Sequence, residues 1–193
     1  MLTSAVTKEL VVCTVGHSTR PLATFLALLE TNDIGVVLDV RTIPRSRHNP
    51  QFNFDSLPGF LSAAAIHYKH LPELGGLRKT HVNSPNTGWR NLSFRGYADY
   101  MQTPEFEHGV EQVVKLAQQN RCALMCAEAV PWRCHRSLIA DALTVRGVRV
   151  EDIIATTGRR LHVLTPWAKV DVLGITYPAA TVNSTAGKSE SDN

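Results

Sequence analysis

The side chains best suited to chemistry are concentrated in one short segment, CAEAVPWRCHR, which runs from Cys126 to Arg136. Two cysteines, a glutamate, a histidine and two arginines lie within it, directly after an apolar run. A thiol surrounded by positive charge favours the thiolate, which attacks electrophiles and binds metals. Histidine and glutamate are groups that move protons. The segment therefore predicts a site, although it does not by itself select a reaction.

Cys134 is the candidate nucleophile of this segment. We expect it to begin a helix, where backbone N–H groups and the helix dipole stabilise an anion. The neighbouring Arg133, His135 and Arg136 add positive charge, which lowers the pKa of a thiol. The alternative is that Cys134, and more readily Cys126, is a small buried hydrophobic residue without a chemical role.

The acid–base groups are predicted from the same segment and from the end of an earlier apolar run. Glu128 stands two residues after Cys126, on the same face of an extended segment, and His17 follows the run at residues 10–16. The predicted catalytic residues are therefore Glu128, Cys134, His135 and His17.

A metal site is the competing interpretation of the segment. Cys126, Glu128, Cys134 and His135 are all plausible zinc ligands, and four ligands would complete a tetrahedron. The usual Cys-x2-Cys spacing is absent, and the adjacent Cys134 and His135 are an awkward pair for one ion at a helix start. We predict no cofactor and no metal, and if a metal binds, these four residues are its expected ligands.

Arginines on the loop after a second apolar run predict contact with an anion. The planar guanidinium suits bidentate binding of phosphate or carboxylate. Arg41 has a structural alternative, as a brace paired with Asp39 or Glu128, and Ser18 has one as a helix cap. The predicted substrate-binding residues are Ser18, Arg41, Arg45, Arg47 and Arg136.

The elements that must position these residues follow from hydrophobic patterning. Apolar runs predict buried strands at residues 10–16, 34–40 and 122–126, and the alternating segment at residues 66–71 predicts a half-exposed or edge strand. The segments at residues 148–155 and 160–164 predict two last strands, or one strand and an edge. Helical stripes begin at residues 22, 55, 97 and 137, and the third is interrupted near residues 103–104. The alternation predicts an α/β fold, with a mostly parallel sheet of about five strands and helices on both faces.

The candidate catalytic and substrate-binding residues are predicted to meet at one edge of that sheet. In open α/β sheets, ligands bind outside the carboxyl ends of the strands. His17, Arg41 and Glu128 each follow a different predicted strand. We therefore expect one site at the carboxyl edge of the sheet, to which several loops contribute.

The chain also carries a series of short motifs, namely GHS (16–18), DVRTIPRS (39–46), LGG (74–76), FRGYADYM (94–101) and CAEAVPWRCHR followed by SLIADAL. In this order and spacing they resemble the domain-of-unknown-function family 488, over roughly residues 10–165. The resemblance implies an α/β domain, usually found alone in a short chain, and it implies no reaction.

Composition sets the remaining expectations. The chain has 193 residues, of which 44% are hydrophobic and 19% charged, as in a globular protein with one domain. We predict an N-terminal lead at 1–9, a single domain at 10–168 and a C-terminal extension at 169–193 whose end is disordered. The N-terminus does not resemble a signal peptide, and no apolar run is long enough for a membrane span. The four cysteines are too few and too scattered to predict a dense disulfide framework. We therefore predict a cytoplasmic protein without a membrane partner.

These observations favour an enzyme of the hydrolase or transferase class. Its expected partner is an anionic small molecule or nucleic acid, with a phosphate-bearing nucleotide or nucleic acid favoured as substrate. Two alternatives remain open. One is a non-catalytic nucleic-acid-binding module that uses the same arginines, and the other is a thiol-dependent or metal-dependent sensor.

Overall fold

A six-stranded sheet forms the centre of the computed structural model, which describes residues 9–156 and 158–180. The strand order is β3-β2-β4-β1-β5-β6. The first five strands pair in parallel, and β6 pairs antiparallel with β5 at one edge. The strands are β1 (Val11–Gly16), β2 (Val36–Asp39), β3 (His67–His70), β4 (Cys122–Cys126), β5 (Arg149–Ala155) and β6 (Gly158–Leu161). The predicted mostly parallel sheet is confirmed, with six strands instead of about five.

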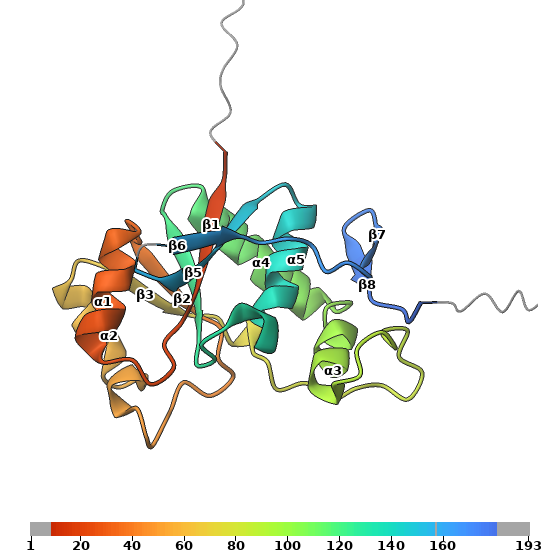
Figure 1. Ribbon diagram of the computed structural model, residues 1–193, viewed down its shortest axis with the longest axis horizontal. Coiled ribbons are helices and arrows are strands. Elements are labelled where there is room, and N and C mark those ends of the chain that lie inside the picture. Colours follow the sequence, from red (N-terminus) through yellow and green to blue (C-terminus); the bar gives the residue numbers. More distant parts are fainter. Residues whose placement is uncertain (1–8, 157, 181–193) are drawn as a thin grey trace, which may run out of the picture.

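Helices cover both faces of the sheet, as predicted (Figure 1). On one face, α1 (Leu22–Thr31) and α2 (Leu57–Ala63) enclose a core with Phe25 and Leu61. On the other face, α3 (Leu92–Tyr100), α4 (Pro104–Ala117) and α5 (Arg136–Val145) enclose a core with Tyr97 and Leu138. The central strands β1, β2 and β4 lie between these two cores, which explains why they are continuous apolar runs.

Polar side chains organise the long segment between β3 and α3, which has no hydrophobic period. The 3₁₀ turn η2 (Pro72–Leu74) lies at the start of this segment, and another, η1 (Pro50–Phe52), lies between β2 and α2. The buried Asp99 carboxylate then accepts hydrogen bonds from the His81 backbone N–H at 2.9 Å, from the Ser84 hydroxyl and from the Asn86 amide at 2.8 Å. One carboxylate on α3 thus holds a loop that lacks secondary structure of its own.

The C-terminal part of the described chain packs onto the domain. A hairpin of β7 (Lys169–Asp171) and β8 (Gly174–Thr176) precedes Tyr177, which is fully buried. The Tyr177 hydroxyl donates to the buried Asp141 carboxylate at 2.9 Å. The core therefore continues past the predicted domain end at residue 168. Residues 1–8, in the predicted lead, and residues 181–193, in the predicted disordered end, lie outside the described residues.

The chain order creates a crevice at the carboxyl edge of the sheet. Both β1 and β2 lead to helices on one face, whereas β4, which lies between them, leads through the 3₁₀ turn η3 (Pro131–Arg133) to α5 on the opposite face. Connections that leave neighbouring strands toward opposite faces open a space at that edge. Within residues 9–156 and 158–180, no helix is both long and apolar enough to cross a membrane.

Candidate functional site

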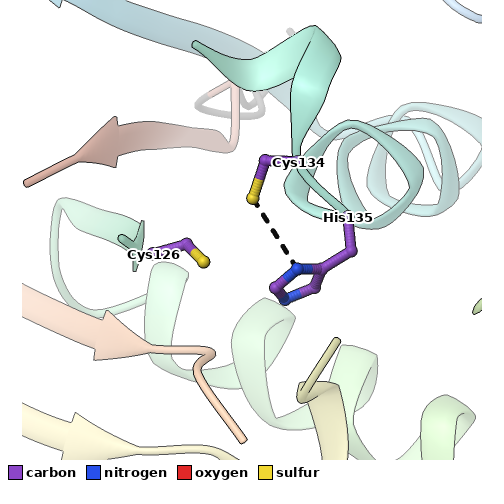
Figure 2. A group of neighbouring side chains, drawn as sticks. All are labelled: Cys126, Cys134 and His135. Atoms are coloured by element: carbon purple, nitrogen blue, oxygen red, sulfur yellow. Dashed lines mark hydrogen bonds between the residues drawn. The ribbon is translucent and has the colours of Figure 1, made fainter. Parts of the chain in front are cut away.

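Cys126, Cys134 and His135 converge at the carboxyl end of β4. Cys126 is the last residue of β4, and Cys134 lies between η3 and α5 in an extended conformation. Figure 2 shows the two sulfur atoms and the His135 ring pointing into the same space. Cys126 is 8% exposed and Cys134 is 4% exposed. Cys134 was expected to begin the helix, but α5 begins at Arg136, after an N-cap at His135.

Three polar groups surround the Cys134 sulfur. The Nδ1 atom of His135 lies 3.6 Å from it, the Nε–H of Arg136 donates to it at 3.4 Å, and the Cys126 sulfur lies within 4.8 Å of it. The Cys126 hydrogen bond, followed by His135 and Arg136, lowers the pKa of Cys134 well below its ordinary value, although burial acts in the opposite direction. The same hydrogen bond and burial raise the pKa of Cys126. The arrangement therefore favours a thiolate on Cys134 beside a neutral thiol on Cys126.

A backbone carbonyl fixes the orientation of the His135 ring. Its Nε2 atom lies 2.9 Å from the carbonyl oxygen of Val40. A carbonyl oxygen only accepts, so Nε2 carries the proton in this contact. In the neutral ring Nδ1 is then unprotonated and faces the Cys134 sulfur, where it can take the thiol proton.

Two glycines allow this close packing. A Cβ atom on Gly76 would lie 2.4 Å from His135 Nδ1, and one on Gly16 would lie 2.0 Å from the Glu128 carbonyl oxygen. Gly76 was not among the predicted site residues. The LGG and GHS motifs contain these glycines, but only the structure shows what each of them packs against.

Arg136, which was predicted to bind substrate, is 1% exposed and contacts protein groups. Its Nη2 donates to the Glu128 carbonyl oxygen at 2.6 Å while its Nε donates to the Cys134 sulfur. Arg136 is the first residue of α5, and its two hydrogen bonds direct its side chain toward the loop that precedes the helix. It therefore fixes the loop and the thiolate and is not open to an anion from solvent.

Two cavities adjoin at Glu128. The first, of about 290 Å³, is lined by both cysteines, His135, Arg133 and Glu128. The second, of about 370 Å³, lies between the loops that follow β1, β2 and β4, and Arg41, Arg45 and Glu128 are among its lining residues. Both cavities include residues that directly follow β4, at the carboxyl edge of the sheet.

Arg41 is held by a buried carboxylate at the floor of the second cavity. Its Nε and Nη2 donate to the two Asp39 carboxylate oxygens at 2.8 and 2.6 Å. Tyr68 donates a further hydrogen bond to Asp39 at 2.7 Å. The expected ion pair between Arg41 and a carboxylate under the loops is confirmed, and its partner is Asp39 and not Glu128.

His17 is enclosed beside Arg41. Its ring stacks on Phe52 with centroids 4.2 Å apart, and it is 1% exposed. Nε2 lies 3.2 Å from Arg41 Nη1, and Nδ1 lies 2.9 Å from the Ser18 carbonyl oxygen. Burial lowers the pKa of His17 to about 4. Both ring nitrogens are therefore engaged with protein groups, although His17 is among the residues that line the second cavity, and its acid–base role stays a prediction.

This burial makes stability depend on pH. The unfolded chain takes up the His17 proton near its ordinary pKa of 6.5, whereas the folded protein resists it until about pH 4. The neutral His17 therefore contributes its full share of the free energy of unfolding above pH 6.5, and this share is lost as the pH falls toward 4. We expect the free energy of unfolding to fall by about 2 kcal/mol from this group between about pH 7 and pH 5. Urea unfolding of His17→Gln should lack this decrease, and His48→Gln, at an exposed position, should retain it. Equal decreases in both variants would contradict the assignment.

The thiol cluster also has some features of a metal site. The potential ligand atoms of Cys126, Cys134 and His135 lie within 4.8 Å of one another, and Glu128 is not part of this group. The adjacent Cys134 and His135 do converge, contrary to the expectation from their spacing, because Cys134 is extended and the helix begins after them. The Arg136 guanidinium at 3.4 Å from the Cys134 sulfur supplies a positive charge that favours an anionic sulfur over a second cation. The absence of a metal remains a prediction.

A family model described as "Domain of unknown function DUF488" matches residues 21–143, more than half of the chain. The chain belongs to this family. The resemblance expected from the motifs is therefore confirmed. No curated protein and no solved structure matches the chain. The matched part of this DUF488 protein extends from the residue before α1 into α5 and contains Asp39, Gly76, Cys126 and Cys134, whereas His17 lies outside it.

The remaining predicted residues lie at the surface of the DUF488 domain. Arg45 is 71% exposed and pairs with Asp55 at 3.5 Å. Arg47 is exposed and is not among the residues that line the second cavity. Glu128 is exposed, and its carboxylate accepts from the Ala129 backbone N–H at 3.1 Å.

Ser18 lines the second cavity but does not cap α1. The N-cap of that helix is Pro21, without a side-chain hydrogen bond, so the expected cap is wrong. The backbone φ of Ser18 is 48°, because the chain turns sharply between β1 and α1.

Proposed function

We propose that this DUF488 protein is an enzyme of the hydrolase or transferase class with Cys134 as its nucleophile. The observation that carries the proposal is the surroundings of the Cys134 sulfur, which contacts His135 Nδ1 at 3.6 Å and Arg136 Nε at 3.4 Å beside the Cys126 thiol. A structural cysteine in an apolar core has no need of these neighbours. A nucleophile needs an adjacent base that is itself oriented by a third group, and the Val40 carbonyl orients His135.

The substrate in this proposal carries phosphate or another anionic group, and a nucleotide or nucleic acid is the favoured class. The second cavity offers the Arg45 guanidinium at its rim and Arg41 at its floor. Glu128 lines both cavities, so one substrate can place its anionic group near Arg45 and its reacting atom near Cys134.

The reaction then proceeds by attack of the Cys134 thiolate on an electrophilic carbon or phosphorus. A covalent bond to sulfur forms as the bond to the leaving group breaks. The proton that His135 Nδ1 took from the thiol passes to the leaving group. The exposed Glu128 carboxylate accepts a proton from the water or acceptor hydroxyl that then releases the group from sulfur.

Alkylation of Cys134 tests the proposal and does not require an identified substrate. The rate of iodoacetamide modification, followed by mass spectrometry from about pH 5 to pH 9, should rise at a pH well below the value near 8.5 of a free thiol. Inorganic phosphate, a nucleoside monophosphate or a short oligonucleotide should slow the modification. Arg45→Ala should remove this protection, whereas Arg47→Ala, outside the cavity, should retain it. An ordinary thiol profile, or no protection by any of these anions, would overturn the proposal.

A further inference from the structure

Cys126 is a second thiol at the proposed active site, and thiolate attack by Cys134 does not require it to be a cysteine. Its sulfur lies within 4.8 Å of the Cys134 sulfur, and both residues line the cavity of about 290 Å³. The chain carries four cysteines, and all are free. A serine would also donate a hydrogen bond to the Cys134 thiolate. What a thiol adds in that position is the ability to form a bond to sulfur.

We propose that Cys126 and Cys134 form a reversible disulfide in the presence of a peroxide, and that this bond switches the site off. The inference rests on the proposed function, because the same Cys134 sulfur is the nucleophile in both reactions. Nothing in the family description assigns such a modification.

The reaction needs only the peroxide as oxidant. The Cys134 thiolate attacks one peroxide oxygen, the O–O bond breaks, and hydroxide leaves, so that Cys134 becomes a sulfenic acid. The Cys126 sulfur then attacks the Cys134 sulfur. The S–O bond breaks and the hydroxide leaves with the Cys126 proton as water. In total, two thiols lose two electrons and two protons, and one peroxide becomes two molecules of water.

The backbone holds the two cysteines in different ways. Cys126 is fixed in β4, where it pairs with Gly16 of β1. Cys134 lies outside the sheet, between a short 3₁₀ turn and the start of α5. A disulfide requires the sulfurs to approach to about 2.05 Å, so the turn that carries Cys134 is the part that must shift. Such a shift removes the sulfur from His135 and Arg136, and the bond removes its nucleophilic electron pair.

The other two cysteines provide an internal control. Cys13 and Cys122 are both completely buried and lie on neighbouring strands. Cys13 belongs to the core under α1 and α2, whereas Cys122 belongs to the core under α4 and α5. Their side chains therefore point to opposite faces of the sheet and cannot form a bond with each other.

Peptide mapping after peroxide treatment tests the inference. The reduced full-length chain is exposed to hydrogen peroxide, free thiols are blocked with iodoacetamide in denaturant, and a digest is analysed by mass spectrometry. We expect one cross-linked peptide pair that joins Cys126 to Cys134, while Cys13 and Cys122 are alkylated. In a parallel sample, dithiothreitol added before iodoacetamide should restore all four thiols. The oxidised protein should lose the fast modification of Cys134 until it is reduced.

Two variants separate the steps. In Cys126→Ser, peroxide should leave a sulfenic acid on Cys134 that dimedone labels, and no internal disulfide should form. Cys122→Ser should form the disulfide as the unchanged protein does. The inference would be overturned if Cys126 and Cys134 of the unchanged protein both kept free thiols after peroxide treatment. A disulfide from either of them to another cysteine would also overturn it. If the disulfide forms but no anion protects the reduced Cys134, the thiol chemistry stands and the proposed function fails.

Discussion

Replacing Asp39 with asparagine is expected to lower the free energy of unfolding by about 3–5 kcal/mol, the usual cost of leaving a buried charge without its partner. Asp39 is completely buried, and its two oxygens accept from the Arg41 guanidinium at 2.8 and 2.6 Å and from Tyr68 at 2.7 Å. Asparagine has the same shape, but its side-chain NH2 group would face the Arg41 guanidinium or the Tyr68 hydroxyl, which are themselves donors. The Arg41 charge, 5% exposed, would then lack its counter-charge.

Urea unfolding measures this effect, and the chain contains a matched control. Asp55 pairs with Arg45 at 3.5 Å, but both side chains are about 70% exposed. Asp55→Asn should change the free energy of unfolding by about 1 kcal/mol or less. If the two variants lost equal stability, the Asp39–Arg41 pair would not be the support under the second cavity that the geometry indicates.

Replacing Gly76 with alanine is expected to slow alkylation of Cys134 by about 100-fold near neutral pH, a loss comparable to removal of an acid–base group. The added Cβ would lie 2.4 Å from His135 Nδ1, so the ring must move away. It would then lose the contact with the Cys134 sulfur or the hydrogen bond to the Val40 carbonyl. The onset of alkylation should also move to higher pH, because the thiol loses its base.

Gly59→Ala is the control for this substitution. Gly59 lies in α2, and a Cβ there meets no atom within 4 Å. It should leave the rate and pH profile of Cys134 unchanged. A Gly76→Ala protein that folds and keeps the normal profile would contradict the role of His135 as the activating base.

The sequence determined the layers of this fold and the edge of the sheet at which the site lies. The runs VVCTVG and CALMC become almost completely buried strands, because helices cover a parallel strand on both faces and its side chains must then be largely apolar. Polar residues that follow such runs, such as His17 and Glu128, must then lie at the carboxyl edge. Both facts depend on local patterning, which a single sequence contains.

The two short strands of the C-terminal hairpin were not predicted, and the core extends beyond the expected domain end. Strands of three residues, largely exposed, carry too little hydrophobic pattern to be detected. Tyr177 packs into the core, where its hydroxyl donates to Asp141 on α5 and its backbone N–H donates to Asn86. Both partners are far from Tyr177 in the sequence, so the local hydrophobic pattern does not predict these contacts.

The roles of individual site residues were decided only by tertiary structure. Arg41, Arg45 and Arg136 are alike in sequence, yet Asp39 holds the first, solvent surrounds the second, and the third is buried against the Cys134 sulfur. Whether Cys134 and His135 can meet Cys126 depends on the turn before α5 and on Gly76 beneath the ring. Patterning reports which residues are buried and where a chain turns. The direction of a side chain and the charge that faces it depend on elements that meet only when the chain has folded.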